Sequence, residues 1–216
     1  SLRQELLSEI KVNGTELHCG AGAGLKQIAN AARDHALSGL EFLEGIPGCL
    51  GGALRMNAGS MGSWTFDVVQ RVRFMTQDGS IEEKTAAETA AVYRSCPLLK
   101  KNIALGAVLK GQPAEIEDVR ARMEEFRQHR TSTQPNASSA GCMFKNPESI
   151  PAGKLVDECG LKGLTVGGAR VSERHGNFII NSGKATAADV EALIAQVRER
   201  VAEQRGIELQ TEVQIV

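Results

Sequence analysis

Alternation of apolar and polar residues predicts most of the strands of this chain. Two such runs within residues 9–22 flank Asn13-Gly14, which predicts a β-hairpin because both turn residues tolerate a positive φ angle. The runs VVQRVRFM and SIEEK are joined by a Gln-Asp-Gly turn and predict a second hairpin. Further strands are expected at residues 102–110, in the segments LTVGGARVS and NFIIN, and in the alternating run 208–216.

Apolar residues recur at helical spacing in three segments, which predicts helices over residues 24–36, 114–130 and 187–205. The second has acidic residues early and basic residues late, as the helix dipole favours, and Gly206 provides a stop signal for the third. Strands mixed with a few helices, without a βα repeat of fixed length, indicate an α+β fold rather than a doubly wound parallel sheet.

Composition narrows the class of protein. A chain of 216 residues can form one large domain or two small ones, and a formal net charge of −1 argues against a surface for nucleic acid or anionic membrane. We expect neither a membrane span, which needs roughly 18–20 apolar residues, nor a signal peptide. Five widely spaced cysteines without a C-x-x-C pair, and histidines without H-E-x-x-H spacing, indicate a reducing cytosol and no metal site.

Two glycine-rich segments suggest close approach of the backbone to a ligand. Gly20, Gly22 and Gly24 imitate a dinucleotide fingerprint, but Leu25 stands one residue beyond the last of them, so a simple tight turn is favoured. Residues 45–62 are denser in glycine and contain no Gly-Lys-Ser/Thr sequence. Apolar residues interspersed there are untypical of a solvated linker, so we interpret this segment as a ligand-wrapping loop.

The stretch SSAGCMFKNP, residues 138–147, places Cys142 in a run of small residues. By residue type alone, Cys142 is either a buried core cysteine or a reactive thiol. Tyr93 and Arg94, in VYRSCP, and Glu212, in the last alternating run, are ordinary surface residues when each is considered alone.

Taken together, five motifs occur in an order that resembles one family. They are GLEFLEGIPGCLGGALRMNAGSMG, YRSCP, TQP…SAGCMFKNP, GLKG…GGARVSERHGNFIIN and TEVQIV. The family is UDP-N-acetylenolpyruvoylglucosamine reductase, the flavoenzymes that complete UDP-N-acetylmuramate in bacterial peptidoglycan synthesis. The match looks closer to the shorter subtype, which lacks an extra substrate-covering loop.

The resemblance implies an architecture. It is an α+β fold with an FAD-binding lobe of the vanillyl-alcohol-oxidase type and a smaller α+β substrate-binding lobe. Residues 1–131 are expected to form the second subdomain of the FAD lobe and residues 132–206 the substrate domain, with strand 207–216 returning to the FAD lobe. Family members carry a further N-terminal part with a loop for the flavin pyrophosphate, which nothing in these residues matches. Gln214 stands where the family usually has arginine.

The resemblance also implies the chemistry. FAD and NADPH are the expected cofactors, and UDP-N-acetylglucosamine enolpyruvate is the expected small-molecule substrate of a cytoplasmic, monomeric enzyme without nucleic-acid or membrane partners. Arg94 matches the family's arginine, which stabilises an enolate-like anion, and Glu212 matches its carboxylate. Cys142 falls at the proton donor, commonly a serine; a thiol, with a reference pKa of about 8.5, is a far better acid than an alkanol.

The remaining site residues follow from the same match. Those expected to bind the cofactor are Gly45, Ile46, Pro47, Gly48, Gly51, Gly52, Asn57 and Gly59. Those expected to bind the substrate are Tyr93, Arg130, Gln134, Lys145 and Asn146. Two alternatives stay open: another flavin oxidoreductase of the same FAD-domain superfamily, and a non-catalytic remnant that binds a UDP-sugar or flavin.

Overall fold

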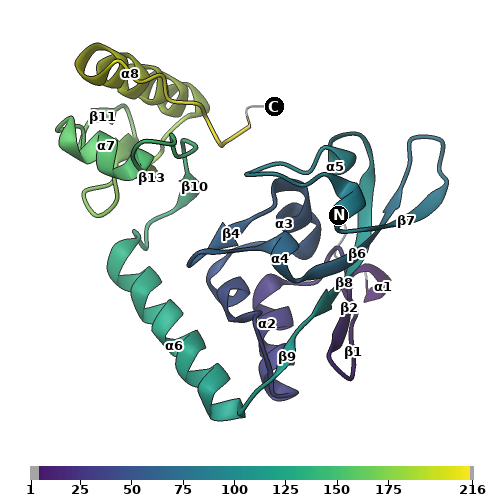
Figure 1. Ribbon diagram of the computed structural model, residues 1–216. Helices are drawn as coiled ribbons and strands as arrows, with labels where there is room; N and C mark the ends of the chain where they lie inside the picture. Colours follow the sequence, from purple (N-terminus) through teal and green to yellow (C-terminus); the bar gives the residue numbers. More distant parts are fainter. Residues whose placement is uncertain (1–4, 215–216) are drawn as a thin grey trace. The chain divides into compact units, whose positions relative to one another are not determined.

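The computed structural model describes residues 5–214 and divides the chain into two compact units, Ser1–His129 and Arg130–Val216. We refer to them as the first and the second unit. Each has a hydrophobic core of its own, and Figure 1 colours the chain from purple at its start to yellow at its end. Among the helices of residues 5–214, none is both long and apolar enough to cross a membrane.

The first unit is built on an antiparallel sheet of five strands in the order β1-β2-β8-β6-β7. Its strands are β1 (Ile10–Asn13), β2 (Glu16–Gly20), β6 (Val69–Met75), β7 (Ile81–Thr85) and β8 (Ile103–Lys110). Both predicted hairpins are confirmed, but the first turns at Gly14-Thr15 instead of Asn13-Gly14. Asn13 is the last residue of β1 and pairs with Glu16, and Gly14 has a φ angle of +58°. Because the sheet is antiparallel, the glycines that follow β2 form a tight turn and not a Rossmann phosphate loop.

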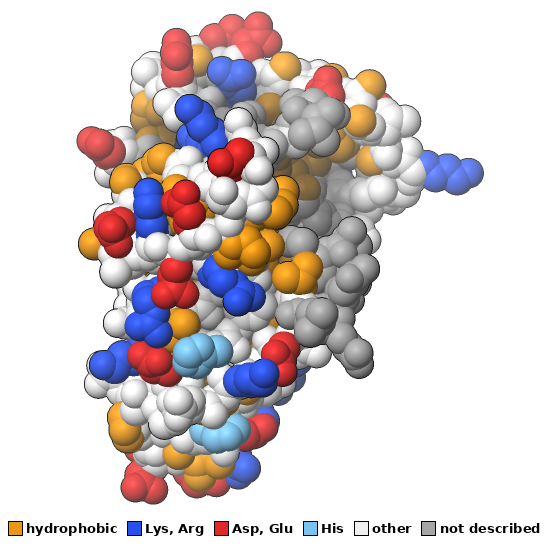
Figure 2. Space-filling model, turned by 90° about the vertical axis from the view of Figure 1, so that its right-hand side faces the viewer, with side chains coloured by type: hydrophobic (Ala, Val, Ile, Leu, Met, Phe, Trp, Pro, Cys, Tyr) orange, Lys and Arg blue, Asp and Glu red, His pale blue; other side chains and the backbone are white. Residues whose placement is uncertain are grey.

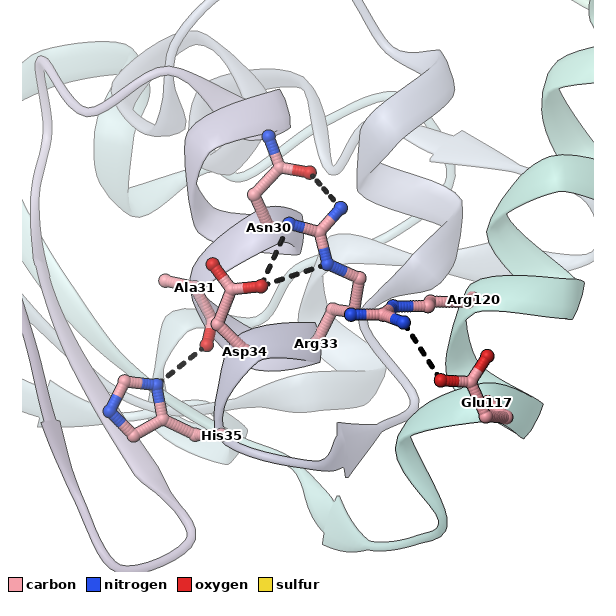
Figure 3. A network of polar contacts seen from close by, with 7 residues as sticks. All are labelled: Asn30, Ala31, Arg33, Asp34, His35, Glu117 and Arg120. Atoms are coloured by element: carbon pink, nitrogen blue, oxygen red, sulfur yellow. Dashed lines mark hydrogen bonds and ion pairs between the residues drawn. The ribbon is translucent and has the colours of Figure 1, made fainter.

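Two helices, α2 (Leu25–Asp34) and α3 (Leu50–Met56), pack against this sheet and close its core (Figure 1). The buried residues of α2 recur at helical spacing, as the sequence pattern predicts: Leu25, Ile28, Ala29 and Ala32. Figure 3 shows the polar contacts at the C-terminal end of this helix, where the Arg33 guanidinium donates to the side chains of Asn30 and Asp34. The Nδ1 atom of His35 lies 2.9 Å from the carbonyl oxygen of Ala31.

Shorter elements complete the first unit. They are α1 (Glu5–Ser8), β3 (Leu37–Ser38), η1 (Glu41–Gly45), β4 (Gly59–Ser60), β5 (Ser63–Trp64), α4 (Thr65–Val68), η2 (Ala87–Thr89), α5 (Leu98–Lys101) and β9 (Gln112–Pro113). The glycine-rich segment 39–64 therefore contains short helical elements, η1 and α3, and a small hairpin of β4 and β5. On the face shown in Figure 2, acidic and basic side chains are interspersed, in keeping with a net charge near zero.

The helix α6 (Ile116–Thr133) runs through the division between the units and extends three residues beyond its predicted end. The second unit holds a sheet in the order β10-β13-β12-β11. Its strands are β10 (Ser139–Cys142), β11 (Thr165–Val166), β12 (Ala169–Val171) and β13 (Phe178–Asn181). The helices α7 (Ala152–Glu158) and α8 (Ala187–Arg205) belong to the same unit, and α8 contacts β11, β12 and α7.

The prediction for α8 is confirmed at both ends. Thr186 caps the helix by accepting a hydrogen bond from the N–H of Asp189, and the Asp189 carboxylate accepts from the N–H of Thr186. Gly206 ends it in the left-handed conformation at φ +65°.

Two strand predictions need correction. LTVGGARVS forms the hairpin β11–β12 instead of one strand, because Gly167 turns the chain at φ +52° while its neighbour Gly168 donates to the Asp189 carboxylate. The run 208–216 forms only an isolated bridge, between Thr211 and Phe144, with two backbone hydrogen bonds beside it. Its last two residues lie outside the described part of the chain.

Candidate functional site

The two glycine-rich segments, which lie far apart in the sequence, are joined in the first unit. The N–H of Leu25 donates to Gly48 O at 3.2 Å, that of Leu50 to Ala23 O at 2.9 Å, and that of Gly51 to Ala21 O at 2.7 Å. A Cβ atom at Gly51 would lie 3.2 Å from the Cβ of Ala21, so this glycine lets α3 approach the turn after β2. Backbone hydrogen bonds therefore hold the turn after β2 against the glycine-rich loop that leads into α3.

Gly48 and Gly52 differ from Gly51 and Gly59 because a Cβ at either position would meet no protein atom within 4 Å. Gly48 has a φ angle of +119°, which L side chains rarely adopt, whereas Gly52 is helical and exposed. Gly45 ends η1, and Ile46 packs against the core. The missing side chains of Gly48 and Gly52 therefore leave room for a ligand.

Asn57, expected to bind the cofactor, is buried and uses its side chain within the protein. It ends α3 in the left-handed conformation at φ +41°. Its Nδ2 atom donates to Val92 O at 3.2 Å, and its Oδ1 accepts from the N–H of Phe66 at 3.1 Å. Asn57 therefore fastens the segment that carries Tyr93 and Arg94 to the end of α3.

Tyr93 and Arg94 form the tip of a tight turn. Val92 and Ser95 exchange two backbone hydrogen bonds, of 2.8 and 3.1 Å, across it. Arg94 has a φ angle of +53°, and its guanidinium lies near the ring of Trp64 as well as that of Tyr93. The Ser95 hydroxyl oxygen is buried and has no hydrogen-bond partner among the described residues, as in a site that closes around a ligand.

Trp64 is a site residue that sequence reasoning missed. It is the chain's one tryptophan, and it pairs with Gly59 across the β4–β5 hairpin. The signal in the sequence was this aromatic residue shortly after the glycine-rich run. Gly59, expected to bind the cofactor, has no room for a Cβ because that atom would overlap the Trp64 ring.

Cys142 ends β10 in the second unit, on a strand made irregular by a register shift between Ser139 and Cys142. Gly141 has a φ angle of +83°, and the two residues after Cys142, Met143 and Phe144, are buried in the core. Phe144 therefore packs inward. Cys142 itself is half-buried, which excludes the interpretation as a core cysteine.

Asn177, which sequence reasoning did not single out, fastens this segment. Its Oδ1 accepts from the N–H of Phe144, and its Nδ2 donates to Phe144 O, both at 2.8 Å. Its backbone carbonyl accepts from Met143, and its backbone N–H donates to the Nδ1 atom of His175. Asn177 is buried, so these bonds are shielded from water.

A pocket of about 390 Å³ lies beside Cys142. Its lining contains several basic side chains and one acidic side chain, that of Asp157. The lining residues are Cys142, Asn146, Pro151, Gly153, Lys154, Asp157, Lys162, Arg174, His175, Gly176 and Asn177. Lys162 donates to the Asp157 carboxylate at 2.6 Å, and burial lowers the pKa of His175. Of the lining residues, Cys142 and Asn146 were expected in the site. Lys162, Arg174 and His175 lie in the motif GLKG…GGARVSERHGNFIIN but had no assigned role, and Lys154 lies outside the five motifs.

The remaining residues expected to bind substrate are held around the same segment. The Oδ1 of Asn146 accepts from the N–H of Ala152 at 3.0 Å, at the start of α7. The N–H of Lys145 donates to Gln210 O. Arg174 donates to the carbonyl oxygen of Gln134, close to Arg130 at the end of α6.

The structure brings Glu212 to the Cys142 segment. Its N–H donates to Met143 O at 2.7 Å, and Leu209 lies in the core of the second unit. The residues after 206 thus make these contacts within the second unit, and their return to the FAD lobe stays a prediction.

Comparison with known proteins agrees with this division. Residues 2–85 match the model of an FAD binding domain, and residues 134–216 match that of the UDP-N-acetylenolpyruvoylglucosamine reductase C-terminal domain. An antiparallel α+β unit with a flavin-binding signature places the chain in the class of FAD-binding proteins.

Relatives identify the family. A UDP-N-acetylenolpyruvoylglucosamine reductase of Nitrobacter winogradskyi is 45% identical over 95% of this chain and 68% of its own length. One of Bacillus velezensis is 41% identical over 97% of this chain and 70% of its own length. The solved structure of the reductase from Thermus caldophilus covers 99% of this chain and 74% of its own, with 37% identity and a TM-score of 0.83. The chain belongs to the UDP-N-acetylenolpyruvoylglucosamine reductase family.

Proposed function

We propose that the protein is an NADPH-dependent flavoenzyme that reduces UDP-N-acetylglucosamine enolpyruvate to UDP-N-acetylmuramate in peptidoglycan synthesis. Family membership supports the reaction. One observation supports the assignment of the site most directly. Cys142 lines a pocket with several basic side chains, and the carbonyl oxygen of the next residue, Met143, accepts a hydrogen bond from the backbone N–H of Glu212. A proton donor, a carboxylate and bases suited to a nucleotide diphosphate are thus held by one unit.

Cofactor binding is assigned to the joined glycine loops. The open positions of Gly48 and Gly52 fit a loop that closes around a flavin. Bound FAD supplies, from NADPH, the hydride that adds to C3 of the enolpyruvyl ether. Gly51, Asn57 and Gly59 shape the loop and its surroundings through contacts within the protein.

The side chains of the protein then stabilise the negative charge of the intermediate and deliver one proton to it. Addition of hydride at C3 leaves negative charge on C2 and the adjacent carboxylate. Arg94, always charged, binds that carboxylate through its planar N–H donors, and Glu212 shares the polarisation of the anion. Cys142 donates its proton to C2 and completes the reduction.

The substrate's diphosphate is assigned to the pocket beside Cys142. Lys154, Lys162 and Arg174 supply positive charge there, and Asn146 adds an amide. Lys145, Gln134, Arg130 and Tyr93 are assigned to the rest of the substrate. We place the enzyme in the cytoplasm, where its free cysteines stay reduced, and expect it to act as a monomer.

The test uses the full-length protein. We expect a yellow protein that oxidises NADPH only when the enolpyruvyl UDP-sugar is supplied, with UDP-N-acetylmuramate as the product identified by mass spectrometry. A flavin-loaded protein that reduces a different substrate instead would identify another flavin oxidoreductase. A colourless protein that binds the UDP-sugar without turnover would identify a binding remnant.

A further inference from the structure

The turn that carries Arg94 holds its backbone in an uncommon conformation. A φ angle of +53° is unusual for a residue other than glycine, and it points the side chain away from the path a regular strand would give it. The two bonds between Val92 and Ser95, with the bond from Asn57, fix the backbone of the turn. They do not by themselves orient the long side chain at its tip, which has several rotatable bonds.

Aromatic rings lie beside the guanidinium. Its central carbon lies 5.1 Å from the centroid of the Trp64 ring and 5.4 Å from that of Tyr93. The rings themselves meet edge to face, with centroids 5.3 Å apart and an interplanar angle of 85°. Both guanidinium distances are within the roughly 6 Å range of a cation–π contact. An arginine that stacks on a ring keeps its in-plane N–H groups available for a carboxylate.

The position of Trp64 is determined by its own surroundings. Its backbone N–H donates to the Asp67 carboxylate at 2.7 Å, which starts α4, and the next N–H, of Thr65, donates to Ala58 O at 2.8 Å. Its ring lies over Gly59, where any Cβ would overlap it. The backbone of Trp64 is therefore held by bonds outside the turn that carries Arg94, and its ring lies between Gly59 and the Tyr93 ring of that turn.

We propose that Trp64 is a positioning residue for Arg94: seated over Gly59, it holds the guanidinium in the orientation that binds the substrate carboxylate. The proposal rests on the function proposed above for Arg94. A prearranged arginine loses less side-chain freedom when the substrate and its developing anion bind, so the contact favours the step that consumes substrate.

The first test separates the half-reactions of the full-length holoenzyme by stopped-flow absorbance. Trp64→Leu removes the ring, Trp64→Phe keeps a smaller one, and Phe126→Leu makes the same aromatic-to-aliphatic change at a partly buried site on α6. We expect Trp64→Leu to slow flavin reoxidation by substrate roughly 5- to 30-fold, the range of a cation–π contact, with Trp64→Phe in between. Flavin reduction by NADPH and the Phe126→Leu control should stay near wild type.

The second test observes Arg94 directly. The NMR signal of its Nε–H group, assigned by its loss in Arg94→Lys, should show ring-current displacement and restricted motion in the wild type. Both should diminish in Trp64→Leu and persist in Phe126→Leu. Unchanged Arg94 signals, equal slowing of both half-reactions, or wild-type reoxidation in Trp64→Leu would each overturn the proposal. If Arg94→Lys itself leaves reoxidation unchanged, the role proposed for Arg94 fails, and the NMR signal alone decides whether Trp64 positions it.

Discussion

The Arg94 turn and the Cys142 segment each present a proposed catalytic side chain from irregular backbone, but they are fastened differently. The side-chain amide of Asn177 both accepts from and donates to the backbone of one residue, Phe144, as a neighbouring strand would, beside the core of the second unit. Asn57 links two separate segments, at Val92 and Phe66, and the Arg94 side chain beyond it rests on aromatic rings.

The difference follows from what each side chain has to do. A proton donor must sit at a fixed distance from one carbon atom, and buried hydrogen bonds give that precision because they are directional. A guanidinium that stabilises a spreading negative charge can tolerate small displacements, and a ring face provides a broad, less directional support. We therefore expect sharp losses from changes in the Cys142 segment and graded losses from changes around the Arg94 turn.

The largest effect is expected at Cys142 itself. Cys142→Ala in the full-length enzyme should leave flavin reduction by NADPH nearly intact and slow reoxidation by substrate about 10²- to 10⁴-fold, the usual contribution of general acid catalysis. Cys142→Ser should recover much of the rate because a hydroxyl can also deliver the proton. Equal slowing of both half-reactions would show that Cys142 shapes the site without delivering a proton.

Gly52 tests the cofactor side of the first unit. Gly52→Val should abolish most of the bound flavin, seen as loss of yellow colour, because the new side chain enters the space assigned to the cofactor. Folding should not suffer, since the residue is helical and exposed and valine has a better helix propensity than glycine. Ala121→Val on the exposed surface of α6 is the matched control. Normal flavin content in Gly52→Val would assign the glycine to structure alone.

Substitutions of Asn177 and Asn57 compare how the Cys142 segment and the Arg94 turn are held in place. Asn177→Ala leaves the buried N–H and C=O of Phe144 unpaired and should lower the free energy of unfolding by roughly 2–4 kcal/mol. Asn57→Gly keeps the positive φ angle and should cost about 1 kcal/mol, because its two partners, the exposed Val92 and the partly exposed Phe66, can turn to water. Denaturant unfolding gives the totals, and amide exchange locates each loss in its unit. A greater cost for Asn57→Gly would reverse the comparison.

The smallest effect is a pH dependence confined to the second unit. Burial, and next the charge of Lys162, lower the pKa of His175 below its ordinary value of 6.5. The unfolded chain therefore binds more protons between the lowered pKa and 6.5, so stability falls as the pH falls through that window. Because the ring is partly exposed, the loss should stay below about 1 kcal/mol. Melting temperatures at several pH values should show it in the wild type and not in His175→Gln.

Local sequence patterns determined the regular elements of this protein. Helical spacing and the capping residues Thr186 and Gly206 define α8, and Gly14 marks the turn of the first hairpin, because these signals act between residues close in the chain. The Cys142, Arg94 and Glu212 assignments came from motif order. The segment LTVGGARVS forms a hairpin where alternation predicts one strand, because its glycine pair permits a reversal that alternation alone does not reveal.

Tertiary structure alone decided how these pieces combine. It joined the turn after β2 to the loop before α3, seated Trp64 over Gly59, and set Asn177 against Phe144, which lies 33 residues away in the sequence. It also gathered the bases of the pocket from α7 and from the segments after it. No periodicity encodes such contacts, because they depend on which backbone groups remain unpaired once the cores have packed.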